Sequence, residues 1–355
     1  MGNRVYLSGP HKDKDPLKPD SIDWKSYAAG LLFQSGIIVS NPIDLDIAGF
    51  MDLHDTEASS STVKESLNLI DKSDSILANL TGKPESTTME IFYAHRLGKQ
   101  VIVFGQEPFS PWIQTHSEAR FHKLKEAMEY LVSTSSKFDM IAWSSQFEKI
   151  LINNSEQFPM TGKSDFEYYS GTLPVLVIAP HSTAYFSNQN LENGESYTGS
   201  ISALLNKLTG CHSLISSYCL PVDPVSYLNS PIVKFTTDII KKAEIKLVIF
   251  LHGFDSWNIP YDVNINSWQN KSLNGREEYV HLLTYLLKTK NIKDVGNNIQ
   301  ITHSSDQKSI YELIFEDLKT PMIKVDIHKR FRLPKMHPDL YTNLTTALAQ
   351  YLMLI

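Results

Sequence analysis

One carboxylate in the first third of the chain, Glu90, is placed where it could react with a sugar. It follows the polar loop Thr81–Thr87, and that loop follows the short apolar run Ser75–Leu80. Such a run is typical of a strand buried on both faces, and open α/β sheets bind ligands where their strands end. A helix with Thr88 as its N-cap would hold Glu90 in its first turn, where the helix dipole favours an ionised carboxylate.

An ionised carboxylate at the floor of such a crevice can attack an anomeric carbon or stabilise positive charge on it. The simpler interpretation is that Glu90 serves the helix dipole and touches nothing else. Gly98 ends the expected helix, and Val101–Phe104 is a second apolar run. Residues 71–105 therefore predict a strand–helix–strand unit, which implies a parallel sheet.

Two histidines in the second half of the chain have matching surroundings. His181 closely follows the apolar run Leu173–Ile178, His252 closely follows Lys246–Phe250, and Glu195 lies between them. Zinc binds histidine nitrogen and carboxylate oxygen, and a catalytic zinc site leaves one position for water. The pattern predicts a zinc site at the carboxyl edge of a sheet. The alternative is that both histidines are structural.

The elements that must position these residues indicate an α/β fold with two domains. The chain has 355 residues, of which 42% are apolar, and this is enough for two cores. We expect each domain to be a mostly parallel sheet flanked by helices. A polar segment without strong periodicity, residues 151–172, is the expected linker between a domain at 1–150 and a domain at 173–355.

Composition excludes several classes of protein. The net charge of −6 gives no electrostatic footprint for duplex nucleic acid, and two cysteines cannot form a disulfide framework. No apolar run approaches the ~20 residues needed to span a bilayer. The N-terminus leads directly into an expected strand, so we expect no signal peptide and a cytoplasmic protein without membrane partners. We also expect a homo-oligomer.

The first 105 residues resemble the nucleoside 2-deoxyribosyltransferase family, including its nucleotide N-glycosidase branch. The resemblance is carried by Arg4–Pro10 (RVYLSGP), by Trp24 with Asn41-Pro42, and by Asp74 with Ser86–Ala94. It implies that Glu90 is the nucleophile and that Asp74 is also catalytic. The implied substrate-binding residues are Tyr6, Ser8, Gly9, Pro10, Asn41, Ser86 and Thr87.

One position departs from that family. A second carboxylate often stands there eight residues before the aspartate, and this chain has Ser66, with Glu65 beside it. A carboxylate at that place would help to protonate the leaving base. Ser66 therefore predicts a slow or hydrolytic domain rather than an efficient transferase.

Residues 173–332 resemble the N-formylglutamate amidohydrolase-like group, which is related in architecture to zinc carboxypeptidases. The resemblance is carried by Ala179–Ser182, Glu195 with Thr198, Asp223-Pro224 with Tyr227, Phe250–Asp255 and Lys324–Arg332. It implies that His181, Glu195 and His252 bind zinc. It also implies that Asp326 and Arg330 are catalytic and that Arg332 binds substrate.

Together these features predict a Rossmann-like domain followed by a zinc-peptidase-like domain in one enzyme. The first would cleave or exchange the N-glycosidic bond of a nucleoside or nucleotide, and the second would hydrolyse a small amide with zinc. An alternative is that the first domain senses a nucleotide without turnover and regulates the second, as in a defence or signalling effector. A further alternative is a second domain that is a metal-free scaffold.

Overall fold

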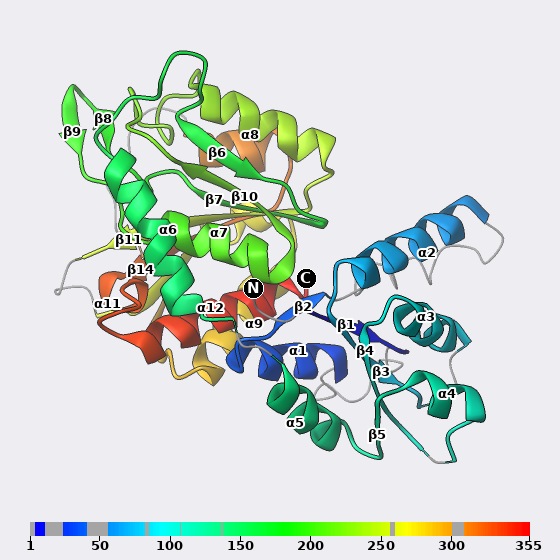
Figure 1. The fold of residues 1–355 in the computed structure, drawn as a ribbon. Helices are drawn as coiled ribbons and strands as arrows, with labels where there is room; N and C mark the ends of the chain where they lie inside the picture. The colour runs from blue at the N-terminus through cyan, green and yellow to red at the C-terminus, as the bar shows by residue number, and fades with distance from the viewer. Residues whose placement is uncertain are drawn as a thin grey trace. The chain divides into compact units, whose positions relative to one another are not determined.

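The computed structural model describes residues 4–10, 24–40, 56–81, 85–106, 108–135, 138–255, 260–299 and 309–355. The chain divides into two compact units, a first unit at Met1–Asp139 and a second unit at Met140–Met353. Each is built on a sheet with helices on its faces (Figure 1). The predicted two-domain α/β class is confirmed.

The sheet of the first unit has five parallel strands in the order β2-β1-β3-β4-β5. Its central strands β3 and β4 are buried on both faces, which explains their consecutive apolar residues Ile76–Ala78 and Val101–Phe104. The strands are β1 (Arg4–Ser8), β2 (Ile38–Ser40), β3 (Ser75–Asn79), β4 (Gln100–Phe104) and β5 (Ala119–Phe121).

Within the described ranges, the helices that flank this sheet are α1 (Trp24–Gln34), α2 (Thr56–Asp71), α3 (Glu85–Arg96), α4 (Pro111–His116) and α5 (Leu124–Thr134). Side chains of α2, α3 and α4 share one buried cluster with Tyr6, Ile76 and Val103 of the sheet. Trp24 of α1 packs edge-on against Phe104, whose side chain points to the opposite face. Tyr6 is therefore aimed at the face that carries α3 and Glu90.

Helix α3 begins earlier than the sequence predicted. It starts at Glu85 rather than at Met89, so Glu90 lies in its second turn. Glu85 supplies the negative charge that a first turn favours, and no helix breaker lies between Glu85 and Arg96. The expectation that the helix dipole stabilises Glu90 is therefore wrong, because that effect fades beyond the first turn.

The sheet of the second unit has seven strands in the order β13-β12-β14-β11-β7-β10-β6. The four central strands, from β14 to β10, are parallel. β6 pairs antiparallel with β10 and β12 pairs antiparallel with β14, while the edge strand β13 is parallel to β12. The strands are β6 (Phe166–Tyr169), β7 (Leu173–Ala179), β10 (Cys211–Ser216), β11 (Leu247–Phe254), β12 (Val263–Asn266), β13 (Val295–Asn297) and β14 (Met322–His328). A separate hairpin pairs β8 (Tyr185–Ser187) with β9 (Asn190–Glu192).

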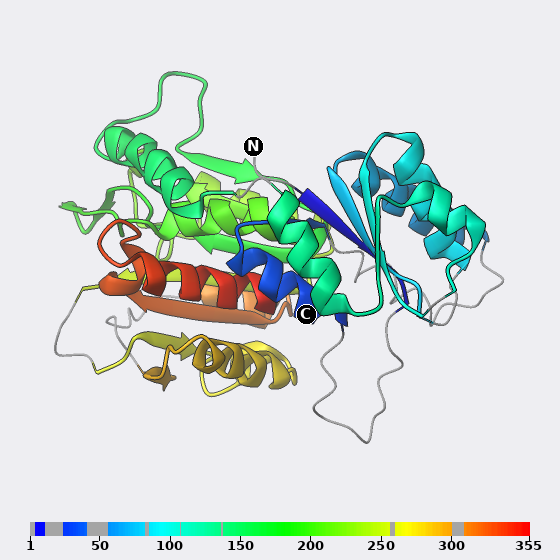
Figure 2. The ribbon, with the colours of Figure 1, turned by 60° about the horizontal axis from the view of Figure 1, so that its bottom comes forward.

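Helices cover both faces of this second sheet (Figures 1 and 2). They are α6 (Met140–Asn154), α7 (Thr198–Thr209), α8 (Pro231–Lys242), α9 (Glu278–Thr289), α10 (Ile310–Glu312), α11 (Lys329–Arg332) and α12 (Pro338–Leu352). Helices α8 and α10 contribute to a buried cluster with Leu176, Val248 and Phe250 on one face. Helices α7, α9 and α12 lie on the other. Among the helices in the described ranges, none combines the length and apolar character needed to cross a membrane.

The boundary between the units differs from the predicted one. The first unit ends at Asp139 rather than at residue 150, and α6 belongs to the second unit. The segment predicted as a linker, 151–172, contains the end of α6 and all of β6, which pairs with β10. A four-residue edge strand is too short to show periodicity, and the burial of α6 depends on residues far along the chain.

Candidate functional site

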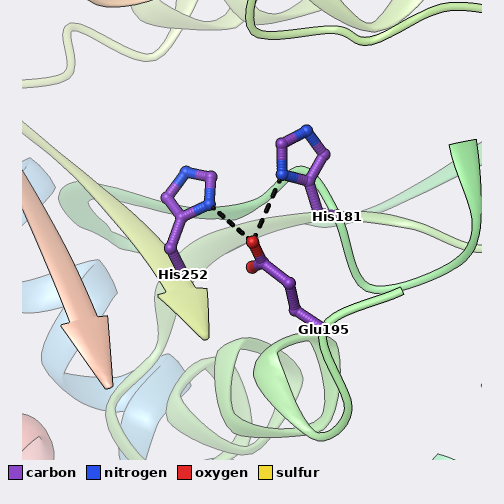
Figure 3. A group of neighbouring side chains, drawn as sticks. All are labelled: His181, Glu195 and His252. Carbon is purple, nitrogen blue, oxygen red and sulfur yellow. Dashed lines mark hydrogen bonds and ion pairs between the residues drawn. The ribbon is translucent and has the colours of Figure 1, made fainter. Parts of the chain in front are cut away.

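Three side chains of the second unit meet near the carboxyl ends of its central strands (Figure 3). The Nδ1 atom of His181 lies 3.4 Å from Oε1 of Glu195, and Nδ1 of His252 lies 3.2 Å from the same oxygen. All three ligand atoms lie within 4.8 Å of one another. The predicted zinc ligands are therefore close together, with the carboxylate pointing between the two imidazole rings.

Different elements carry the three residues. His181 lies two residues beyond the end of β7, and Glu195 lies three residues before the start of α7. His252 was predicted to follow a strand, but β11 continues to Phe254, so the histidine lies inside the strand. His181 is thus placed by a loop that follows a strand, and His252 by the strand itself.

The outer nitrogen of each imidazole ring is also held. Nε2 of His181 lies 2.9 Å from Oδ1 of Asp223, which in turn accepts the N–H of Val225. Nε2 of His252 lies 2.8 Å from the hydroxyl of Tyr311. Metal-binding histidines characteristically have the second nitrogen held by a carboxylate or another polar group, which fixes the ring. Both rings therefore present Nδ1 to the same point.

Sequence reasoning did not assign Asp223 and Tyr311 to the site. Asp223 stands in a motif that resembles the amidohydrolase-like group, and its carboxylate could have been found from that signal. Tyr311 lies 59 residues from His252 in a short helix, and nothing in the local sequence marks it.

Electrostatics keep a negative charge at the centre of this cluster. Burial raises the pKa of Glu195, but the two histidines more than offset it, so the pKa lies well below its usual range. Burial lowers the pKa of His181, yet Asp223 and Glu195 overcome this effect and raise it to about 9. Burial dominates at His252 and lowers its pKa. The centre thus combines an ionised carboxylate with two buried imidazole rings.

The residues present fit a zinc ion. Zinc binds nitrogen and oxygen at about 2.0–2.2 Å in tetrahedral geometry, which separates neighbouring ligand atoms by about 3.4 Å. The two distances from Glu195 to the histidines, 3.2 Å and 3.4 Å, are close to that spacing. The second carboxylate oxygen of Glu195 accepts the N–H of Gly253 at 2.9 Å, so Oε1 is the oxygen left for the centre.

Asp326, predicted as catalytic, lies on the strand next to His252. The two residues are level with each other in the parallel pair β11–β14. Asp326 is buried, forms an ion pair with Lys324 at 2.9 Å, and accepts a hydrogen bond from Asn264 at 3.1 Å. A charged partner and an amide donor hold this carboxylate in a fixed position.

The two arginines predicted for this site have different surroundings, and the catalytic role of Arg330 stays a prediction. Arg330 forms an ion pair with the buried carboxylate of Asp262, and its side chain is 42% exposed. Arg332 is only 2% exposed, and its nitrogens donate to the carbonyl oxygens of Ile327, Ser196 and Phe254 and to the carboxylate of Asp255. Since protein oxygens engage every guanidinium nitrogen, Arg332 is inaccessible to a substrate carboxylate, in contrast to the prediction.

The first unit gathers a second cluster around Glu90. Its Oε1 accepts the hydroxyl of Tyr6 at 2.9 Å, and its Oε2 accepts the hydroxyl of Ser8. The hydroxyl of Ser66 also hydrogen-bonds to this carboxylate, and the buried cation Lys25 contributes positive charge. The sequence placed Tyr6, Ser8 and Glu90 together, whereas Lys25 was missed because it is a single cation in an apolar helix.

Burial is the dominant influence on Glu90. It raises the pKa of the carboxyl group, while the hydrogen bonds from Ser8 and Tyr6, the charge of Lys25 and the hydrogen bond from Ser66 act in the opposite direction. The three hydroxyl donors therefore stabilise the ionised form in a place that otherwise disfavours it.

The turn after β1 needs a glycine. Gly9 has φ +131°, and a Cβ atom there would lie 2.7 Å from Cβ of Asn79 and 2.8 Å from its carbonyl oxygen. No other residue can bring the turn this close to the end of β3. The carbonyl oxygen of Pro10 then accepts the indole N–H of Trp24 at 2.9 Å, which ties the turn to α1.

Among the other residues predicted for this site, one lies at the opposite edge of the sheet, two lie on the helix of Glu90, and one lies outside the described ranges. Asp74 precedes β3, and its carboxylate accepts the backbone N–H of Arg4 at 2.9 Å. This contact joins the amino ends of β1 and β3, the edge opposite Glu90, so the predicted catalytic role of Asp74 is wrong. Ser86 and Thr87 lie in the first turn of α3, the former exposed and the latter buried. Asn41 lies outside the described residues.

Comparison with known proteins finds distant structural similarity. No protein-family model and no curated protein matches the chain. A protein of known structure from Agrobacterium tumefaciens matches with a TM-score of 0.39 and 9% identity, over 54% of this chain and 96% of that one. A putative carboxypeptidase A from Shewanella denitrificans matches with a TM-score of 0.32 and 8% identity, over 53% of this chain and 60% of that one. The MTAN protein of Helicobacter pylori matches with a TM-score of 0.24 and 8% identity, over 48% and 97% of the two chains. Each of these TM-scores lies below 0.5, and the side-chain geometry of the chain itself is the basis for its chemistry.

Proposed function

We propose that the second unit is a zinc-dependent hydrolase of a small amide. The observation that carries the proposal is the pair of Nδ1 atoms facing one oxygen of Glu195, with both Nε2 atoms held from outside. His181, Glu195 and His252 would hold the metal and leave a position for water. The resemblance to the N-formylglutamate amidohydrolase-like group supports an amide as the substrate.

The residues around the centre have distinct tasks in this proposal. Bound zinc would lower the pKa of a water molecule toward ~7 and polarise a carbonyl oxygen. Asp223 and Tyr311 keep the two imidazole rings oriented. Asp326, level with His252 on the neighbouring strand, is the proposed proton acceptor, and Lys324 keeps its carboxylate in place.

For the first unit we propose cleavage or exchange of the N-glycosidic bond of a nucleoside or nucleotide. Glu90 would attack C1′ or stabilise positive charge there while the base departs. Tyr6 and Ser8 orient its two oxygens, and the turn Ser8–Pro10 would hold the sugar or its 5′ substituent.

Removing zinc separates the two activities. Treating purified protein with a metal chelator is expected to abolish amide hydrolysis and to leave base release unchanged, since Glu90 chemistry needs no metal. Amine release from a panel of N-acyl amino acids and base release from a panel of nucleosides and nucleotides are measured in parallel. Re-addition of zinc should restore the first activity. Amide hydrolysis that persists after complete zinc removal would contradict the proposed mechanism.

A nucleotide sensor without turnover is the second candidate for the first unit. Ser66 favours it, because its hydroxyl bonds to Glu90 at a position where a second carboxylate would assist the leaving base. Calorimetric nucleotide binding without base release would identify the sensor, and base release would identify the enzyme.

The pH dependence of base release tests the hydroxyl donors. Only ionised Glu90 is a nucleophile, so the rate should rise with pH through a pKa that burial has raised. Tyr6→Phe removes a hydrogen bond to the ionised form, and we expect the acid limb to move upward by about one pH unit. Tyr27→Phe, at an exposed tyrosine of α1, is the matched control. An unchanged or downward-shifted limb in Tyr6→Phe would show that this hydroxyl does not stabilise the reacting carboxylate.

A further inference from the structure

A single peptide group next to the metal-ligand candidate Glu195 is held at both ends by buried charges. The carbonyl oxygen of Ser196 accepts a hydrogen bond from Nη1 of Arg332. The N–H of Tyr197, which belongs to the same peptide group, donates to Oε1 of Glu148 at 2.8 Å. Arg332 and Glu148 are each 2% exposed. A cation and an anion thus bind the two ends of one peptide dipole.

Both charges are anchored in other elements. The second oxygen of Glu148, on α6, accepts the hydroxyl of Ser200 in the first turn of α7 at 2.6 Å. Arg332, on α11, donates to the carbonyl oxygen of Ile327 at 3.1 Å and to Asp255 at 2.8 Å. The peptide group is therefore fixed relative to α6 on one side and to the ends of β11 and β14 on the other.

The backbone at this place adopts a conformation that needs support. Tyr197 has φ +67°, in the left-handed region that residues with a side chain rarely occupy. Glu195 itself donates its N–H to the carbonyl oxygen of His181 at 2.6 Å, and its own carbonyl oxygen accepts the hydroxyl of Thr198 at 2.8 Å. Hydrogen bonds thus hold the backbone on both sides of the Glu195 side chain.

Gly253 joins the same arrangement. Its N–H donates to Oε2 of Glu195, and a Cβ atom at this position would lie 2.6 Å from both Nη1 and Nη2 of Arg332. The guanidinium group therefore occupies the space that a side chain at position 253 would fill. Four hydrogen bonds fix that group, so moving it aside would cost free energy.

We propose that Arg332 and Glu148 are positioning residues that set the place of the Glu195 carboxylate against the two histidines. This inference rests on the proposed zinc site and adds two charges that lie outside its ligand set. Loss of either charge releases the Ser196–Tyr197 peptide, lets Tyr197 leave its left-handed conformation, and shifts Glu195 away from His181 and His252. The consequence is weaker metal binding in a chain that still folds.

The test compares zinc affinity in matched variants. Glu148→Gln keeps the shape and one acceptor oxygen but removes the charge, and Arg332→Lys keeps the charge but removes the planar fork. The controls are Glu278→Gln and Arg276→Lys, which alter an exposed ion pair of the same unit. Zinc affinity is measured by competition with a chromophoric chelator. The absorption spectrum of the cobalt-substituted protein reports the ligand geometry.

We expect zinc affinity about 10–100-fold lower in both test variants, with an altered cobalt spectrum, and no change in the controls. A lower melting temperature with unchanged zinc affinity and spectrum would overturn the proposal, since it would show a purely structural role. Glu148→Gln decides the question if Arg332→Lys does not fold: weaker zinc binding in that variant supports the proposal, and wild-type affinity overturns it. Wild-type protein without zinc affinity would instead overturn the proposed metal site.

Discussion

Replacing either His181 or His252 by alanine is expected to abolish stoichiometric zinc binding and amide hydrolysis together. Each imidazole supplies one of the three proposed metal ligands. The two ligands that remain in either variant do not hold zinc when the metal is present at micromolar concentration. Wild-type protein should contain one zinc per chain. The matched control is His281→Ala, which removes an exposed histidine of α9 in the same unit. Elemental analysis and amine release measure the outcome.

Either of two results would show that both histidines are structural and do not bind zinc. One is stoichiometric zinc that persists in both alanine variants. The other is the absence of metal from wild-type protein prepared without chelators in zinc-containing buffer. Circular dichroism of each variant is needed alongside, because His181 and His252 are buried and their removal leaves space in the second unit.

Replacing Glu90 by glutamine is expected to reduce base release by several orders of magnitude, as loss of a covalent nucleophile does. Folding should be retained. Burial raises the pKa of Glu90, so the folded state disfavours the ionised form, and at neutral pH a neutral glutamine removes that cost. The variant should therefore melt at the same or a higher temperature than wild type. Glu85→Gln, at an exposed position of the same helix, is the control.

Base release near the wild-type rate in Glu90→Gln would rule out the nucleophile. If wild-type protein binds a nucleotide tightly, releases no base, and loses binding in this variant, the sensor hypothesis holds instead. The two outcomes are separated by measuring binding and base release on the same preparations.

The sequence was most informative where local pattern and position agree. Apolar runs between turn residues predicted the buried parallel strands, and the common edge where such strands end predicted that His181, Glu195 and His252 would meet. These predictions need only the direction of a strand and the fact that parallel strands end at one edge. Tyr6 and Glu90 were assigned to one site by the resemblance to the nucleoside 2-deoxyribosyltransferase family.

Predictions failed where long-range contacts decide the outcome. Glu148 is 49 residues from Tyr197, and Arg332 is 136 residues from Ser196. No local pattern distinguishes a buried arginine that binds carbonyl oxygens from one at an exposed strand end. Asp74 failed differently: it lies at the amino end of β3, where its carboxylate joins two strand starts instead of facing the site.

The hydrogen bonds to the Ser196–Tyr197 peptide have a consequence for when the site of the second unit can form during synthesis of the chain. The three metal-ligand candidates are all synthesised by residue 252, but Arg332 lies 80 residues later, in α11. On the ribosome, the first unit can complete its sheet while the second is still emerging, because domains generally fold as units from the N-terminus. The nascent second unit holds its histidines before it holds the arginine that fixes Glu195. If the proposed zinc site and the positioning role of Arg332 hold, zinc binds with full affinity only after Arg332 has been synthesised.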